Sequence, residues 1–160
     1  MGWQFPPYII LLILSGLLSV ALALYAWQRR RVPGSMSFAL LMLAVSVWSF
    51  SYALGLMSTK LSAIYFWAKV EYLGMLSIPV WWLIFAIQYT GRDKWLTRRN
   101  LILLWSVPFI ILLLIWTNEF HNLFYSEIGL ATIDSYVIMT LTPGVVYWLN
   151  VAYAYVLFLV

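Results

Sequence analysis

Two ionisable residues interrupt a long apolar stretch of the chain, Lys69 and Glu71 within residues 61–90. Charges inside a membrane span are expensive and usually serve a function. Residues two apart on a helix point about 200° away from each other, so these two side chains cannot form one simple pair. Lys69 shares its face with Tyr72, and Glu71 shares its face with Trp82.

The shorter side chain, Glu71, is the better candidate for the interior of a bundle, since Lys69 can extend its ammonium group towards the lipid headgroups. Both charges are expected near the outer boundary of the membrane. One interpretation is that they anchor the helix there. The other is that they sense a ligand or a proton.

A second polar group follows in residues 117–125, where Asn118, Glu119 and His121 stand among aromatic residues. His121 is the sole histidine and cysteine is absent. Because a protein zinc site needs three or four ligands, no metal is expected. His121 is predicted to hold the loop by hydrogen bonds, or alternatively to sense pH or contact a ligand. The candidate sensing residues are therefore Lys69, Glu71, Tyr72, Trp82, Asn118, Glu119 and His121.

Motifs for catalysis are missing from the sequence. It has no phosphate-binding glycine loop, no nucleophile elbow and no paired histidine motif. We therefore expect no catalytic residue and no cofactor. The net charge is +4, but the basic residues stand in short links between apolar blocks, so a nucleic-acid partner is not expected.

The composition predicts an all-α integral membrane protein. Hydrophobic residues make up 65% of the chain and charged residues 9%, with a mean hydropathy of +0.94, whereas soluble domains carry about 25% charged residues. We predict one membrane domain, residues 1–160, built as an antiparallel bundle of five helices. Their expected ranges are about 8–28, 36–57, 61–90, 100–116 and 144–160. Strand-favouring residues within the loop 117–143 predict a small β-hairpin, in which 124–130 pairs with 136–142.

The basic residues predict the orientation, because they concentrate on the cytoplasmic side of membrane proteins. Seven of them follow the first and third helices, at 29–31 and 92–99, while only Lys60 lies in the links on the other side. The N-terminus and the loop 117–143 are therefore expected outside. The predicted location is the inner membrane of a bacterial or archaeal cell, crossed several times, with the lipid bilayer as a partner.

Two prolines fall inside predicted spans, Pro79 in the third and Pro108 in the fourth. A proline within a helix removes one backbone hydrogen bond and crowds the preceding turn. Both are predicted to kink their helices and are candidate hinges.

Several segments together resemble the N-terminal seven-helix region of bacterial sensor histidine kinases. The resemblance rests on their order and spacing: Trp67–Gly74, Pro79, Trp82, Phe85, Tyr89–Gly91, Thr117–Phe124, Pro143–Gly144 and Tyr147–Trp148. It implies a signal-input module, or receptor, of a two-component system whose first five helices are present here. It also implies two further helices and a cytoplasmic output domain beyond residue 160, a homodimer formed through the full-length parent, and an unidentified small ligand or membrane signal. Kinase activity would belong to that parent.

Three other classes of membrane protein bear comparison with this sequence. A small carrier of the tryptophan-rich sensory (translocator) family also has five helices, but its long loop follows the first helix, whereas here the long loop follows the fourth. A purely structural membrane subunit is the remaining alternative. A retinal photoreceptor would need a lysine in its last helix, and residues 144–160 contain none.

Overall fold

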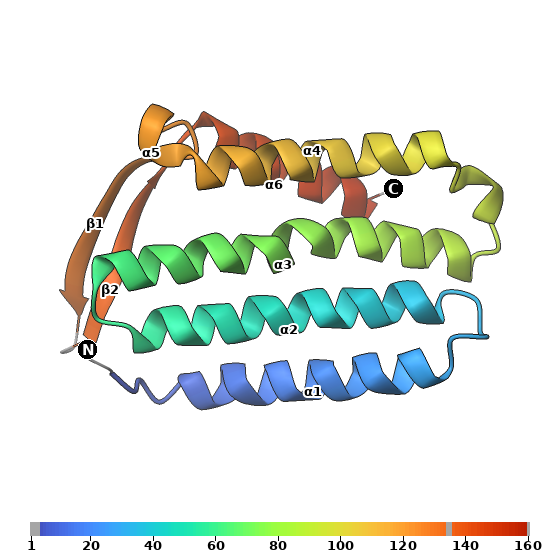
Figure 1. The fold of residues 1–160 in the computed structure, drawn as a ribbon, viewed down its shortest axis with the longest axis horizontal. Helices are drawn as coiled ribbons and strands as arrows, with labels where there is room; N and C mark the ends of the chain where they lie inside the picture. The colour runs from blue at the N-terminus through green and yellow to red at the C-terminus, as the bar shows by residue number, and fades with distance from the viewer. Residues whose placement is uncertain (1–3, 134–135, 160) are drawn as a thin grey trace.

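A computed structural model describes residues 4–133 and 136–159 of the chain. Three long helices follow one another in antiparallel order and lie side by side, as Figure 1 shows: α1 (Ile9–Gln28), α2 (Ser35–Met57) and α3 (Leu61–Tyr89). The short links between them force each helix to return along its predecessor. The remaining elements are η1 (Asp93–Trp95), α4 (Arg98–Trp116), α5 (Asn118–His121), β1 (Tyr125–Ile133), β2 (Tyr136–Pro143) and α6 (Val145–Leu159).

Four of these helices, α1 to α4, are long and apolar enough to cross a membrane, with lengths of 19 to 29 residues. The helix α6 is apolar but has 15 residues, which corresponds to about 22 Å, against about 30 Å for the hydrocarbon core. The predicted fifth span, 144–160, is therefore a shorter helix in the described part of the chain. Its final residue, Val160, lies outside the described residues, as do residues 134–135 of the predicted outer loop.

The fourth helix starts two residues earlier than predicted. Thr97 has extended backbone angles and its hydroxyl accepts a hydrogen bond from the Asn100 amide at 3.3 Å. This is an N-cap, which satisfies one of the amides that a helix leaves free at its start. Both predicted hinge prolines, Pro79 and Pro108, are buried within unbroken helices, α3 and α4.

Small residues form the contacts between the first three helices. The buried face of α1 carries Gly16, Ser19, Ala23 and Ala26, and large apolar residues such as Leu11 and Leu18 are exposed. This is the distribution of a helix in lipid, where small residues let helices approach and large ones face the acyl chains. The closest approach is at Gly74 of α3, where an added Cβ would lie 2.5 Å from the Ala44 carbonyl oxygen of α2.

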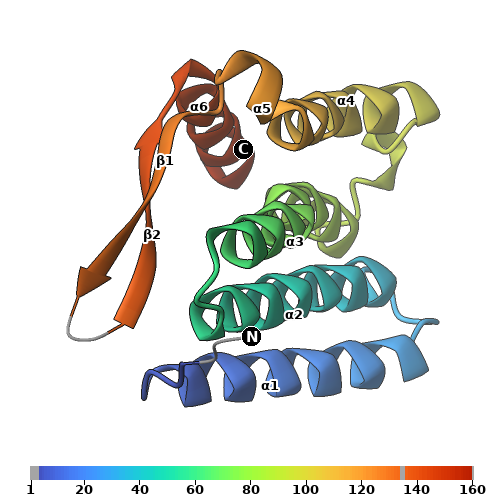
Figure 2. The same cartoon turned by 60° about the vertical axis from the view of Figure 1, so that its left-hand side comes forward.

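The helices α4 and α6 lie on the other side of α3 from α1 and α2, as Figure 2 shows. Val80 and Leu83 of α3 pack there with Leu104 of α4 and Leu157 of α6. The Tyr153 hydroxyl of α6 donates a hydrogen bond to the Leu104 carbonyl oxygen at 2.6 Å. The core of this half is therefore shared by three helices.

The strands β1 and β2 form the predicted antiparallel hairpin, with Ile128 opposite Leu141 and Ile133 opposite Tyr136. It is longer than the predicted pairing of 124–130 with 136–142, and a bulge lies between Tyr125 and Glu127. Figure 1 shows it crossing the end of the bundle at which α3 begins. The hairpin thus covers one end of the helices.

The contact at Gly74 predicts a large effect of adding one methyl group. In Gly74→Ala the Cβ would meet backbone atoms of Ala44 and Trp48, and backbone cannot move aside as a side chain can. We expect a loss of about 1–3 kcal/mol, measured by unfolding in detergent. The control is Gly55→Ala, where the nearest atom is at 3.6 Å and we expect a change within about 0.5 kcal/mol. Equal stability of the two variants would contradict the close approach.

Candidate functional site

A cavity of about 420 Å³ lies between the hairpin and the adjacent ends of the helices. Its volume is within the range of small-molecule sites. One wall comes from the helices and the other from the two strands. The lining residues are Tyr8, Tyr52, Gly55, Leu56, Ile64, Ala68, Glu71, Tyr72, Tyr125, Val137, Ile138, Met139 and Leu141.

Glu71 is the only charged residue among the described residues that line this cavity. One of its carboxylate oxygens, Oε1, accepts a hydrogen bond from the Trp48 indole nitrogen at 2.9 Å. In the described part of the chain the carboxylate has no ion-pair partner. The prediction that Glu71 faces the interior agrees with this position.

Two buried tyrosines close the inner wall of the cavity. The Tyr125 hydroxyl of β1 donates a hydrogen bond to the Tyr72 hydroxyl of α3 at 2.7 Å, and Phe124 packs edge-on against both rings. Burial raises the pKa of Tyr125 well above its usual value, so its hydroxyl stays protonated and remains a donor. The pair joins the hairpin to α3 across 53 residues of sequence.

Gln4 connects β2 of the hairpin to the helices by hydrogen bonds. Its side-chain amide donates to the Val137 carbonyl oxygen at 2.7 Å and accepts from the Val137 amide at 2.8 Å. The same amide nitrogen donates to the Leu56 carbonyl oxygen at 2.8 Å. Sequence reasoning missed Gln4, and also Trp48, Tyr52 and Tyr125, because each acts through a partner distant in the sequence.

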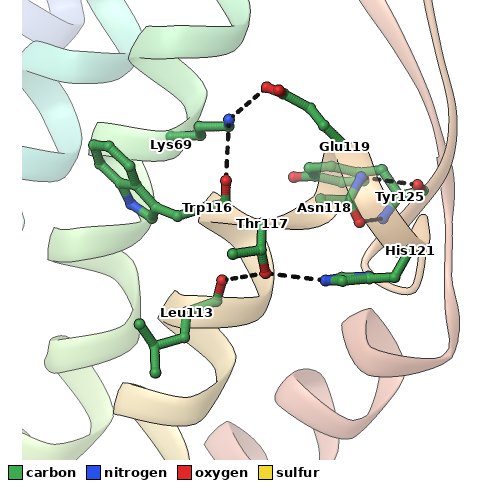
Figure 3. A network of polar contacts seen from close by, with 8 residues as sticks. All are labelled: Lys69, Leu113, Trp116, Thr117, Asn118, Glu119, His121 and Tyr125. Atoms are coloured by element: carbon green, nitrogen blue, oxygen red, sulfur yellow. Dashed lines mark hydrogen bonds and ion pairs between the residues drawn. The ribbon is translucent and has the colours of Figure 1, made fainter.

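Lys69 lies on another face of α3 and belongs to a separate polar network, drawn in Figure 3. Its ammonium group forms an ion pair with Glu119 at 2.8 Å and donates to the Trp116 carbonyl oxygen at 3.4 Å. It also lies 4.4 Å from the centre of the Tyr65 ring. Glu119 is largely exposed, so the ion pair is solvent-screened and contributes little stability.

Asn118 is the buried centre of the turn that connects α4 to the hairpin (Figure 3). Its side-chain oxygen accepts hydrogen bonds from the amides of Phe124 and Tyr125, at 2.9 and 3.1 Å. Its side-chain nitrogen donates to the Tyr125 carbonyl oxygen at 3.0 Å. One side chain therefore satisfies three backbone groups that the turn would otherwise bury without partners.

His121 forms hydrogen bonds within the same turn. Its Nδ1 accepts a hydrogen bond from the Leu123 amide at 3.0 Å, and its Nε2 lies 3.1 Å from the Thr117 hydroxyl. That hydroxyl donates to the Leu113 carbonyl oxygen at 2.7 Å, so the neutral ring with its proton on Nε2 fits every partner. The sequence predicted such a loop-holding histidine. A second proton on Nδ1 would remove the acceptor of the Leu123 amide.

The seven predicted sensing residues therefore do not form one site. Glu71 and Tyr72 line the cavity, whereas Lys69 and Glu119 pair beside it. Asn118 and His121 organise the turn. Trp82 lies about three turns further along α3, where its ring faces Phe85 and Phe158.

The hydropathy of α1 to α4, the lipid-type packing and the hairpin-covered cavity indicate a membrane protein that has four helices long and apolar enough to span a bilayer and a candidate small-molecule site at one end. The profile of the family described as the N-terminal 7TM region of histidine kinase matches residues 11–160. The chain belongs to this family, a membrane sensor region that is not itself catalytic. The resemblance found in the sequence is thereby confirmed. No curated protein and no solved structure matches the chain.

The arrangement around Asn118 predicts a strong dependence on this side chain. In Asn118→Ala the three backbone groups of Phe124 and Tyr125 lose their partners, which should destabilise the turn by about 3 kcal/mol. Unfolding in detergent, followed by tyrosine fluorescence and circular dichroism, measures the loss.

The control is Asn122→Gly. Asn122 is exposed with a positive φ of 51°, which glycine adopts freely, so its replacement should change stability by less than about 0.5 kcal/mol. An Asn118→Ala variant as stable as this control would show that the turn does not depend on Asn118.

Proposed function

We propose that this chain is the signal-input module of a histidine kinase or a related signalling protein, and that it relays an extracytoplasmic or membrane signal to a cytoplasmic output domain. The main observation behind the proposal is the cavity between the helices and the hairpin. Glu71 of α3 lines it on one side and the strands line it on the other. Membership in the family described as the N-terminal 7TM region of histidine kinase supports the same role.

The proposal requires the two walls of the cavity, the hairpin and the helices, to move relative to each other. The hairpin meets α3 through few contacts, chiefly the Tyr72–Tyr125 pair, and is tied to α2 through Gln4. A ligand shifts a conformational equilibrium only when it binds the two states differently. A ligand that touches both walls would bind the two states differently, because it makes all its contacts only when the hairpin is closed against the helices.

The strand β2 leads directly into α6, which provides a route away from the cavity. The Gly144 amide donates to the Phe124 carbonyl oxygen at 2.8 Å, and the Val146 amide donates to that of Leu123 at 3.1 Å. At the other end of α6, Phe158 lies against Trp82 of α3, with ring centres 6.4 Å apart. In the proposal, closing of the hairpin moves α6, and α6 carries the movement to the cytoplasmic end.

The proposal includes an orientation. The N-terminus and the hairpin face the outside of a bacterial or archaeal inner membrane, and α6 is the fifth of seven spans, completed by residues beyond 159. The unequal distribution of basic residues supports this orientation. The output domain would bring two copies of the parent together as a homodimer.

The orientation can be tested with single cysteines, because the chain contains none. Thr132 in the hairpin and Lys94 in η1 are both exposed. In intact spheroplasts we expect a membrane-impermeant maleimide to label Thr132→Cys at once and Lys94→Cys only after permeabilisation. The reverse pattern would invert the proposed orientation, and labelling of both would contradict the separation of the two positions by a membrane.

The role of the cavity can be tested in the natural full-length protein by following the activity of its output domain. Glu71→Gln keeps the shape of the side chain and the hydrogen bond from Trp48 but removes the charge. We expect it to change the signal concentration for half-maximal output by about 5-fold or more, the usual scale of allosteric coupling.

The matched control is Glu127→Gln, since Glu127 is an exposed acid on the same hairpin and does not line this cavity. Its response should equal that of the unaltered protein. An unchanged response in Glu71→Gln, or an equal change in both variants, would remove the cavity from the proposed mechanism. A gene that encodes no output segment after residue 160 would remove the relay.

A further inference from the structure

The cavity described above combines several aromatic rings with one carboxylate, that of Glu71, which has no basic partner among residues 4–133 and 136–159. Four tyrosines contribute to its lining: Tyr8, Tyr52, Tyr72 and Tyr125. The rest of the wall is apolar, from Leu56 and Ile64 on the helices and from Val137 to Met139 on β2. An aromatic ring attracts a cation to its face. The chemistry of the wall therefore favours a ligand with a positive end and an apolar body.

Within the part of the chain that the structure describes, the carboxylate of Glu71 has no basic side chain as a partner. The nearest basic residue in sequence, Lys69, points to another face of α3 and is paired with Glu119. Trp48 supplies a hydrogen bond but no charge. A half-buried carboxylate without a cation is costly, and a cationic ligand would remove that cost as well as adding its own contacts.

A metal ion fits this wall poorly. Calcium and magnesium take six or more oxygen ligands, usually with several carboxylates. Within residues 4–133 and 136–159 no group of three acids, histidines or cysteines gathers at any point. One carboxylate beside tyrosine rings and aliphatic side chains is instead the composition that holds an organic ammonium group.

We propose that the cavity binds a small organic cation, an ammonium group carried on an apolar or aromatic body, with Glu71 as its counter-ion and Tyr52 as part of the ring wall around the charge. This inference rests on the proposed function in that it assigns the ligand class of the same cavity. The apolar body lies against β2, so that bound ligand holds the strand against the helices.

The test uses the chain in dodecyl maltoside, an uncharged detergent that does not itself attract cations. The probes are 2-phenylethylammonium, its neutral counterpart 2-phenylethanol and the anion 3-phenylpropionate, with binding measured by calorimetry. We expect saturable binding in which the cation is favoured over the alcohol by about tenfold or more, as for a charge-assisted hydrogen bond. The anion should not bind detectably.

Two variants test whether Glu71 is the residue that recognises the positive charge of the ligand. Glu71→Gln should reduce the cation's affinity by about tenfold and leave that of the alcohol within a factor of two. Glu119→Gln, which changes the other acid close to the start of the hairpin, should leave both affinities unchanged. Circular dichroism checks that each variant is folded.

The ring contribution has its own pair of variants. Tyr52→Phe keeps an aromatic face and should leave the cation's affinity nearly unchanged, whereas Tyr52→Leu should lower it by about threefold or more. Because Tyr52 is partly exposed in α2, neither change is expected to unfold the protein. These variants keep the proposal testable even where a substitution of Glu71 perturbs the fold.

Each unfavourable result has a definite meaning. Equal affinity for cation and alcohol would assign the cavity to neutral apolar molecules, and absence of saturable cation binding at millimolar concentration would also overturn the proposal. Cation binding that depends on Glu71, in a full-length protein whose output ignores Glu71→Gln, would overturn the proposed function and leave this inference standing. If the output depends on Glu71 but the cavity binds the cation no better than the alcohol, this inference would be overturned and the proposed function would stand.

Discussion

Inside a lipid bilayer a polypeptide backbone must satisfy its own hydrogen-bonding groups, and this requirement decides where each non-helical part of this chain can lie. The hairpin has two open edges, so it belongs at the end of the bundle, where Figure 1 places it. A two-stranded hairpin is marginal by itself. The chain therefore supplies the missing backbone partners from side chains, Gln4 at one edge and Asn118 at the base.

The same requirement explains the close packing of the three long helices. Since their backbones are already satisfied, the helices gain stability by approaching each other, and small residues permit this. Gly74 allows α3 to lie against the backbone of α2 near Trp48, and Trp48 is also the residue that hydrogen-bonds Glu71. The position of the half-buried Glu71 thus depends on a glycine about one helical turn away.

Local properties of the sequence predicted much of the fold. Hydropathy gave the ranges of α1 to α4, and strand propensity gave the hairpin, because both depend on residues close together in the chain. The helical rotation between Lys69 and Glu71 correctly predicted that they cannot pair. The predicted fifth helix, 144–160, and the described helix α6, Val145–Leu159, begin one residue apart, and residue 160 lies outside the described residues.

The site was less accessible to sequence reasoning. The sequence predicted that Glu71 and Trp82 lie on the same face of α3. Three turns of helix separate them, however, and Glu71 lines the cavity whereas Trp82 packs against Phe158. Gln4 and Val137 are 133 residues apart, and neither has a sequence signal for this contact. Such contacts depend on how the helices pack, because that packing decides which end of the bundle the hairpin lies against.

The two polar networks around α3 differ in what a change in their environment would do. The Lys69–Glu119 pair is already neutralised and its acid is exposed to solvent, so an added charge or a ligand gains little there. Among the described residues the Glu71 carboxylate has no basic partner, and the far wall of its cavity is the hairpin. A sensor needs an interaction that is unsatisfied in one state and satisfied in the other. In the described part of the chain, Lys69 is paired with an acid whereas Glu71 has no basic partner, although the two residues lie two positions apart on the same helix.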